Sequence, residues 1–186
     1  MIYGRRLYSP DVVMNTQPNL LLIPDFYPQA TELFALLLTT ISWDKSMQAR
    51  QTASFGKAYN YSQMFYPDSA IPKFLMPVQH ALFDQLHIQF NNCLLNYYET
   101  GEHTMGFHAD DTSALMPHTG VAIVSLGSER QITYRSKIDP SIQIHYALAS
   151  GSLLYMDDQV QDAWVHAIKR QKHVGARISL TWRVFR

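Results

Sequence analysis

The tripeptide His108-Ala109-Asp110 brings together two side chains that bind metal ions. If this segment is extended, His108 and Asp110 lie on one face, because side chains of a strand repeat every two residues. A third nitrogen ligand could come from His166, in a later apolar segment. Two histidines and one carboxylate form the facial arrangement that holds non-haem Fe(II) with open coordination positions. An ordinary surface or core histidine beside an aspartate gives the same tripeptide, so the pattern alone leaves both interpretations open.

A second pattern alternates polar and apolar residues over Arg177-Ile178-Ser179-Leu180-Thr181-Trp182-Arg183. In a strand, the two arginines and two hydroxyl residues would share one face, and the three apolar residues the other. Two guanidinium groups on one face suit the two carboxylates of a dicarboxylic ligand, because each can form a bidentate ion pair. Upstream, Asn96 and Tyr98 alternate in the same way and could supply neutral hydrogen bonds to that ligand. An amphipathic edge strand with a solvated basic face is the alternative.

These motifs need strands to position them, and the chain contains several candidates. Apolar residues recur at helical spacing over Pro28–Trp43 and Pro77–Phe90, which predicts two amphipathic helices. From Cys93 onward, short β-type runs alternate with turn signals. The expected strands are Cys93–Glu99, Val121–Leu126, Gln131–Ser136, Ile142–Ala147, Ser152–Met156, Trp164–Lys169 and Arg177–Phe185. Helices followed by antiparallel strands predict a mainly β fold of the α+β type, with the helices packed on one face of a jelly roll.

Length and composition limit the class of protein. With 186 residues, 47% of them hydrophobic, we expect one domain over residues 1–186, with helices and a lid in about 1–92 and the jelly-roll core in about 93–186. No apolar run approaches the ~20 residues of a membrane span, and no secretory segment is evident. We therefore expect a cytoplasmic protein, or a nuclear one in a eukaryote, without membrane contact. The single cysteine, Cys93, excludes an intramolecular disulfide and a zinc site of several thiolates.

Charge is balanced over the whole chain but unevenly distributed along it. Residues 1–129 hold 6 basic and 11 acidic side chains, a net charge of −5. Residues 130–186 hold 9 basic and 4 acidic side chains, a net charge of +5. Such an asymmetry can produce a basic face on a neutral protein, and basic faces bind nucleic acid.

Taken in order, these motifs resemble the AlkB-type Fe(II)/2-oxoglutarate dioxygenases, which remove alkyl groups from nucleic-acid bases. The resemblance covers nearly the whole chain and is strongest over Asn96–Tyr98, Gly106–Asp111, Ile123–Gly127, Gly151–Leu154, Trp164–His166 and Arg177–Arg183. It implies a double-stranded β-helix in which the catalytic iron is bound by His108, Asp110 and His166. It also implies that 2-oxoglutarate is surrounded by Asn96, Tyr98, Arg177, Ser179, Thr181 and Arg183.

Further upstream, Arg50–Gly56 and the following Tyr59-Asn60-Tyr61-Ser62 resemble the nucleotide-recognition lid of this family. The substrate-binding residues expected from this resemblance are Arg50, Phe55, Tyr59, Tyr61 and Asp111. A tyrosine such as Tyr61 could stack on a base taken out of its duplex, and Asp111 could accept from the exocyclic nitrogen of that base. An aromatic hairpin that only packs on the fold, and an aspartate that caps a turn, are the alternatives.

Four residues depart from those frequent in the family: Ser54, Thr112, Ser179 and Trp182. The latter two lie on the expected cosubstrate strand. We expect the chemistry to tolerate both, because Ser179 keeps a hydrogen-bonding group and Trp182 should face away from the ligand. Ser54 and Thr112 lie in the segments that resemble substrate-contacting parts, and they leave the choice of substrate open.

The implied function is oxidative demethylation of alkylated bases, such as 1-methyladenine and 3-methylcytosine, in DNA or RNA. The cofactor would be Fe(II), the cosubstrates 2-oxoglutarate and O2, and the released products succinate, CO2 and formaldehyde. We expect a monomer. Two alternatives remain, because fold and iron site do not determine what is oxidised. They are a 2-oxoglutarate-dependent hydroxylase of a protein or small molecule, and a non-catalytic jelly-roll module that binds a metal.

Overall fold

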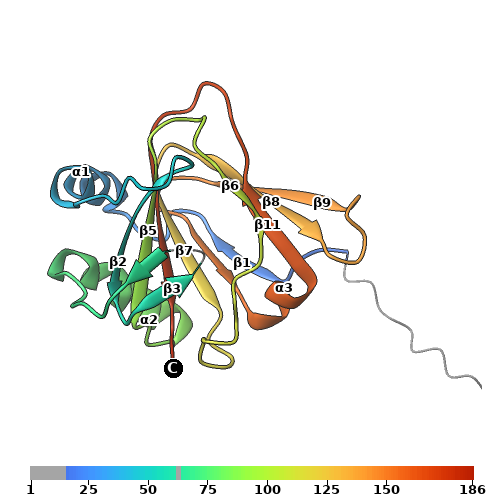
Figure 1. Cartoon of the computed structure of the whole chain (residues 1–186), viewed down its shortest axis with the longest axis horizontal. Coiled ribbons are helices and arrows are strands. Elements are labelled where there is room, and N and C mark those ends of the chain that lie inside the picture. Colours follow the sequence, from blue (N-terminus) through green and yellow to red (C-terminus); the bar gives the residue numbers. More distant parts are fainter. Residues whose placement is uncertain (1–15, 62–63) are drawn as a thin grey trace, which may run out of the picture.

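Two antiparallel sheets lie against each other in the computed structural model (Figure 1), which describes residues 16–61 and 64–186 and, for residues 59–61 and 64, only the backbone. The larger sheet has the strand order β1-β10-β7-β12-β5-β2, and the smaller sheet has the order β6-β11-β8-β9. One cluster of buried apolar residues fills the space between the sheets and draws members from both. Two facing antiparallel sheets form the jelly roll that the sequence predicts, so the expected fold class is confirmed.

Each sheet combines segments that lie far apart along the chain. The larger sheet is built from β1 (Leu20–Ile23), β2 (Gln51–Gly56), β5 (Asn92–Tyr98), β7 (Val121–Gly127), β10 (Leu153–Met156) and β12 (Arg177–Arg183). The smaller sheet is built from β6 (Met105–His108), β8 (Arg130–Ser136), β9 (Gln143–Leu148) and β11 (Trp164–Ile168). A separate hairpin pairs β3 (Tyr59–Tyr61) with β4 (Met64–Tyr66). The helical segments are α1 (Ala30–Thr40), the 3-10 turn Lys73–Leu75, α2 (Met76–Leu86) and α3 (Asp158–Ala163).

The strand that carries the arginine pattern lies in the middle of the larger sheet. β12 pairs with β7 on one side and with β5 on the other, and all seven of its residues are buried. Its apolar residues Ile178, Leu180 and Trp182 belong to the core that the helices cover. The alternative of an edge strand with a solvated basic face is therefore wrong. The basic side chains of β12 point into the protein, as a ligand-binding strand requires.

Helices α1 and α2 lie on the same side of the larger sheet, at the left in Figure 1, and cover its outer face. The buried face of α1 consists of Ala30, Leu33 and Leu37. Both helices end earlier than the apolar spacing predicts. α1 stops at Thr40, because Ile41 adopts an extended conformation, and α2 stops at Leu86, because His87 is left-handed with φ 56°. A residue with positive φ cannot continue a right-handed helix.

The β-structure begins before Cys93, contrary to the expected division of the chain. β1 pairs with β10 and β2 pairs with β5, so the N-terminal half supplies both edges of the larger sheet. β1 is a run of only four apolar residues, which periodicity alone cannot assign to a strand. β2 coincides with the segment expected to form the lid. The strand β6 and the short helix α3 are further elements that the sequence pattern did not predict.

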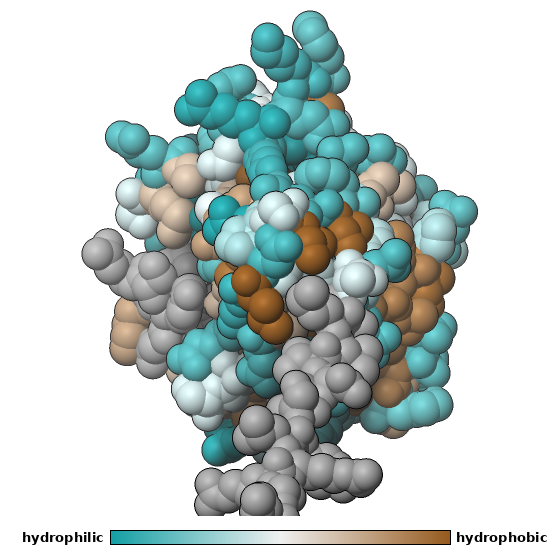
Figure 2. Space-filling model, turned by 90° about the vertical axis from the view of Figure 1, so that its right-hand side faces the viewer, coloured by the Kyte–Doolittle hydropathy of each residue, from teal (hydrophilic) through white to brown (hydrophobic). Residues whose placement is uncertain are grey.

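Among the residues that the structure describes, no helix combines the length and the apolar character needed to cross a membrane. The side of the molecule on which β9 lies is shown in Figure 2, where hydrophilic side chains predominate around small groups of hydrophobic ones.

Gly127, at the end of β7, provides a test of the fold. Its φ is +85°, and an added Cβ would lie 2.5 Å from the carbonyl oxygen of Ala176 and 2.7 Å from a ring carbon of Phe34. We expect Gly127→Ala to lower the free energy of unfolding by at least about 2 kcal/mol, from backbone strain and overlap together. Chemical denaturation measures this. Gly106→Ala is the control, because a Cβ there meets nothing within 4 Å. Equal stability of the two variants would contradict the prediction.

Candidate metal and cosubstrate site

The two predicted histidine ligands lie opposite each other on neighbouring strands. His108 ends β6 and is the register partner of His166 in β11. Asp110 follows two residues later, and one ligand atom from each of the three side chains lies within 4.8 Å of the others. The Nδ1 atom of His108 lies 2.9 Å from the carbonyl oxygen of Gly106, which favours Nδ1–H and leaves Nε2 available for a metal. The structure thus brings the predicted triad together.

Two further contacts hold Asp110 in place. Its backbone N–H donates to Oε1 of the buried Gln161 at 2.8 Å, and Gln161 lies in α3. Its carboxylate forms an ion pair with the guanidinium of Arg183, and the two side chains are only 8% and 6% exposed. The second carboxylate oxygen lies 3.9 Å from Nε2 of His166. The carboxylate is therefore fixed from one side by Arg183 and directed with its other oxygen toward the histidines.

The protonation states of Asp110 and His166 suit metal binding. Burial alone would raise the pKa of Asp110, but the positive charge of Arg183 and the neighbouring imidazoles outweigh it and hold that pKa below its usual value. Burial, together with His108, lowers the pKa of His166 to about 4. Near neutral pH, Asp110 is thus ionised and His166 is neutral, which are the forms that coordinate a divalent cation.

The predicted cosubstrate residues meet in one pocket of about 280 Å³, which the triad also lines. They come from two paired strands, since Arg177 is the register partner of Tyr98 and Ser179 that of Asn96. The remaining two members, Thr181 and Arg183, follow on β12 and line the same pocket. Strand alternation therefore places the six expected residues on one wall, beside the three metal-ligand candidates.

Arg177 is the buried cation at the inner end of this wall. It is 1% exposed, and its Nη2 donates to Oγ of Ser125 at 2.9 Å. Its Nε and Nη1 have no hydrogen-bond partner among the described residues. Burial lowers its pKa to about 10, so the group stays charged near neutral pH. A buried guanidinium with two free donor atoms fits the carboxylate of a small dicarboxylic acid.

The expected substrate residues are not brought together to the same extent. Arg50 lines the pocket, and its Nε donates to Oδ1 of Asn96 at 2.8 Å. Asp111 is exposed and does not line the pocket. Its carboxylate accepts a hydrogen bond from the backbone N–H of Ser113 at 2.9 Å, which matches the alternative that this aspartate caps a turn. Hydrogen bonds from the side chain and from the backbone N–H of Ser113 hold the pKa of Asp111 below its usual value.

Phe55 and two tyrosines of the expected lid were also predicted to contact the substrate. Phe55 packs against the core under the helices and does not line the pocket. The reason is alternation in β2, which directs Phe55 to the face opposite Thr52 and Ser54. Phe55 therefore lies outside this pocket, and its contact with a substrate stays a prediction. Tyr59 and Tyr61 lie on β3, but their side chains are outside the described residues.

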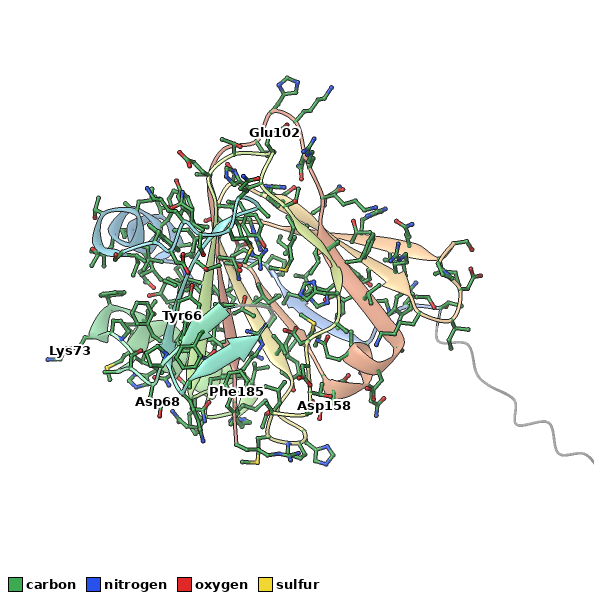
Figure 3. The ribbon with its side chains drawn as sticks, in the orientation of Figure 1. Tyr66, Asp68, Lys73, Glu102, Asp158 and Phe185 are labelled. Carbon is green, nitrogen blue, oxygen red and sulfur yellow. The ribbon has the colours of Figure 1, made fainter. Side chains whose placement is uncertain are left out.

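The hairpin itself is tied to the larger sheet. The hydroxyl of Tyr66, labelled in Figure 3, lies 2.6 Å from Oγ1 of Thr52 in β2 and donates to Asp44 at 3.1 Å. Tyr66 and Phe185 both pack against Leu94, which lines the pocket. The β3–β4 hairpin therefore stands beside the pocket, where a lid is expected.

Several residues of the site were not predicted from the sequence. Leu94 alternates with Asn96 and Tyr98 along β5, so the same strand pattern could have found it. Ser125, which holds Arg177, alternates with Ile123 in the same way. Gln161 gave no such signal, because its contact with Asp110 spans 51 positions of the chain.

Comparisons with known proteins agree with this geometry. The sequence model of a family described as the 2OG-Fe(II) oxygenase superfamily matches residues 25–183. The human DNA oxidative demethylase ALKBH2 is 32% identical over 151 residues, which cover 72% of this chain and 56% of that protein. The bovine alpha-ketoglutarate-dependent dioxygenase alkB homolog 3 is 26% identical over 175 residues, covering 83% of this chain and 61% of that protein.

Among solved structures, OsALKBH1 superposes with a TM-score of 0.65 at 17% sequence identity, over 90% of this chain and 98% of that one. At this identity the similarity concerns the fold. The chain spans between about half and two thirds of the length of these two curated relatives, 56% of one and 61% of the other.

We expect Asp110→Asn to weaken Fe(II) binding, because two neutral imidazoles remain without an anionic ligand. The loss should exceed ~10–100-fold, which is the usual cost of removing a residue that only hydrogen-bonds to a metal ligand. Anaerobic titration with Fe(II) measures the affinity. Asp111→Asn is the matched control, since it removes an exposed carboxylate one position along the chain. Near-normal Fe(II) affinity in Asp110→Asn would show that the triad is misassigned.

Proposed function

We propose that this chain, which belongs to the 2OG-Fe(II) oxygenase superfamily, oxidatively demethylates alkylated bases in nucleic acid. One observation carries the proposal: the two-histidine, one-carboxylate triad and the buried Arg177 line the same pocket. The relatives named above support the substrate class, because ALKBH2 is a DNA oxidative demethylase and is 32% identical. That residues 1–186 act as one monomeric dioxygenase domain is part of the same proposal.

The donor set fits the cofactors that this family uses. His108, Asp110 and His166 would hold Fe(II), because two neutral imidazoles and one carboxylate match its preferred ligands. Arg177 would bind the distal carboxylate of 2-oxoglutarate through its two unpartnered donor atoms, with Asn96 and Tyr98 beside it. When bound, the iron and 2-oxoglutarate supply the oxidising chemistry, with O2 as the oxidant and succinate and CO2 as products.

The residues of the chain orient the metal ligands, exclude water and select the substrate. Arg183 keeps Asp110 ionised and turns one carboxylate oxygen toward the histidines. Because β12 is central and the wall is buried, bulk water has little access to the cosubstrate residues. A base with an N-methyl group would enter beside Arg50 and Leu94, under the β3–β4 hairpin. In this proposal Tyr59 and Tyr61 contact the base, and Asp111 would reach it only by leaving its bond with Ser113.

The direct test uses short oligonucleotides that contain 1-methyladenine or 3-methylcytosine. We expect a loss of 14 mass units per lesion, together with formaldehyde, when Fe(II), 2-oxoglutarate and O2 are present. Mass spectrometry measures the product. His166→Ala is the matched control and should abolish conversion, because it removes a proposed iron ligand. Succinate formation without any change in the oligonucleotide would favour a protein or small-molecule hydroxylase, and no succinate at all would favour a non-catalytic module.

A second prediction concerns the cosubstrate. Arg177→Ala should raise the half-saturating concentration of 2-oxoglutarate at least about tenfold, because a buried, charge-assisted ion pair is lost. Arg177→Lys should recover only part of the affinity, since an ammonium cannot form the bidentate pair. The control is Arg170→Ala, which removes an exposed arginine whose contact is with Glu102 at 3.6 Å. Identical 2-oxoglutarate titrations of the wild type and Arg177→Ala would contradict the assignment.

A further inference from the structure

Arg130 is a second buried arginine close to the pocket, and the proposed chemistry does not use it. It opens β8 and is 0% exposed. Its three hydrogen bonds all go to backbone carbonyl oxygens: Nη1 to Thr100 at 3.3 Å, and Nη2 to His103 at 3.0 Å and Lys169 at 2.6 Å. Among the described residues, no carboxylate forms an ion pair with it. The hydrogen bonds of this buried positive charge thus all go to backbone dipoles.

The charge of Arg130 lies beside the cosubstrate wall. Its Cζ lies 5.7 Å from the ring centroid of Tyr98, and Cζ of Arg177 lies 5.4 Å from the same centroid. Tyr98 is 1% exposed and lines the pocket. One aromatic ring is therefore in cation–π contact with two guanidinium groups. The positive charge of Arg130 also contributes, after burial, to the lowered pKa of Arg177.

Two uncompensated cations in one buried region are unfavourable unless an anion joins them. Moving a charge out of water costs several kcal/mol even after the protein relaxes, and backbone carbonyls supply only partial charges in return. A ligand that places a carboxylate beside Arg177 would meet the field of both guanidiniums. The region is thus preorganised for a dianion rather than for a monoanion of the same shape.

We propose that Arg130 is a positioning residue for the cosubstrate: it fixes the ring of Tyr98 and adds a second positive charge behind Arg177, so that the pocket selects a dicarboxylate. This inference rests on the proposed function, in which Arg177 binds the distal carboxylate of 2-oxoglutarate. Arg130 acts through Tyr98 and through its field, and it touches neither the ligand nor the metal-binding triad.

A purely structural role is the competing explanation, because Arg130 also ties the β5–β6 loop to the end of β11. The two roles differ in what they do to ligands. A structural tie supports the whole pocket, so its loss weakens every ligand alike. A positioning role affects only the ligand with the distal negative charge.

The experiment compares two ligands that differ in this one charge. 2-Oxovalerate has the carbon chain of 2-oxoglutarate with a methyl group in place of the distal carboxylate. Binding of each to the Fe(II)-loaded protein is measured by anaerobic isothermal titration calorimetry, without turnover. Arg130→Gln removes the charge and keeps hydrogen-bond donors, whereas Arg130→Lys keeps the charge. Arg135→Gln is the matched control, because Arg135 lies on the same strand but stacks on Phe107, 3.9 Å from its ring centroid.

We expect Arg130→Gln to weaken 2-oxoglutarate binding about tenfold, or ~1.4 kcal/mol, while 2-oxovalerate affinity changes less than about threefold. Arg130→Lys and Arg135→Gln should keep the wild-type ratio of the two affinities. Equal weakening of both ligands in Arg130→Gln would overturn the inference and assign Arg130 a structural role. If Arg130→Gln does not fold, Arg130→Lys tests the inference instead. A tenfold decrease in the ratio of 2-oxoglutarate affinity to 2-oxovalerate affinity, despite the retained charge, would overturn the inference. A wild-type protein that binds neither ligand would instead refute the proposed function itself.

Discussion

The buried ion pair between Arg183 and Asp110 joins the two sheets at the site. Arg183 ends the central strand of the larger sheet, whereas Asp110 follows the edge strand of the smaller one. Breaking a buried pair by removing one partner costs about 3–5 kcal/mol, because the other charge stays behind uncompensated. The pair also lowers the pKa of Asp110 against the effect of burial. The ionised state of Asp110, a candidate metal ligand, thus depends on a residue from the opposite sheet, and the pair forms only when the two sheets pack against each other.

β12 can support this ion pair because one of its faces packs in the core and the other lines the pocket. Ile178, Leu180 and Trp182 are fully buried against the helix-covered core, which anchors the strand. The alternate residues turn the polar wall toward the space between the sheets. Since each face is determined by the pleat, a shift of one residue in register would exchange the arginines with the core. The alternation of apolar and polar residues therefore determines which side chains of β12 line the pocket as strongly as it determines which ones enter the core.

This alternation explains which features the sequence could predict. Features that depend on one strand, such as the shared face of the polar residues of β12, followed from the pattern, whereas the burial of that face depends on the neighbouring strands β5 and β7. Features that depend on distant segments did not: the edge strand β1 is too short for periodicity to classify, and Gln161 reaches Asp110 from α3 across 51 positions. Phe55 and Asp111 lie outside the pocket for local reasons. β2 turns Phe55 toward the helices, and Asp111 has an alternative partner in the backbone N–H of Ser113, which competes with any role at the pocket.

The pocket region holds more buried positive than negative charge. Arg130, Arg177 and Arg183 are each at most 5% exposed, and the one carboxylate among the residues lining the pocket is Asp110. Asp110 compensates Arg183, but among the described residues no carboxylate forms an ion pair with Arg130 or Arg177, and buried charges without a counter-ion are unfavourable. The surplus becomes favourable only when an anion binds. A divalent metal would add to the positive charge, so a monoanion would leave most of the surplus uncompensated. The charge distribution of these side chains therefore favours a ligand that carries two negative charges.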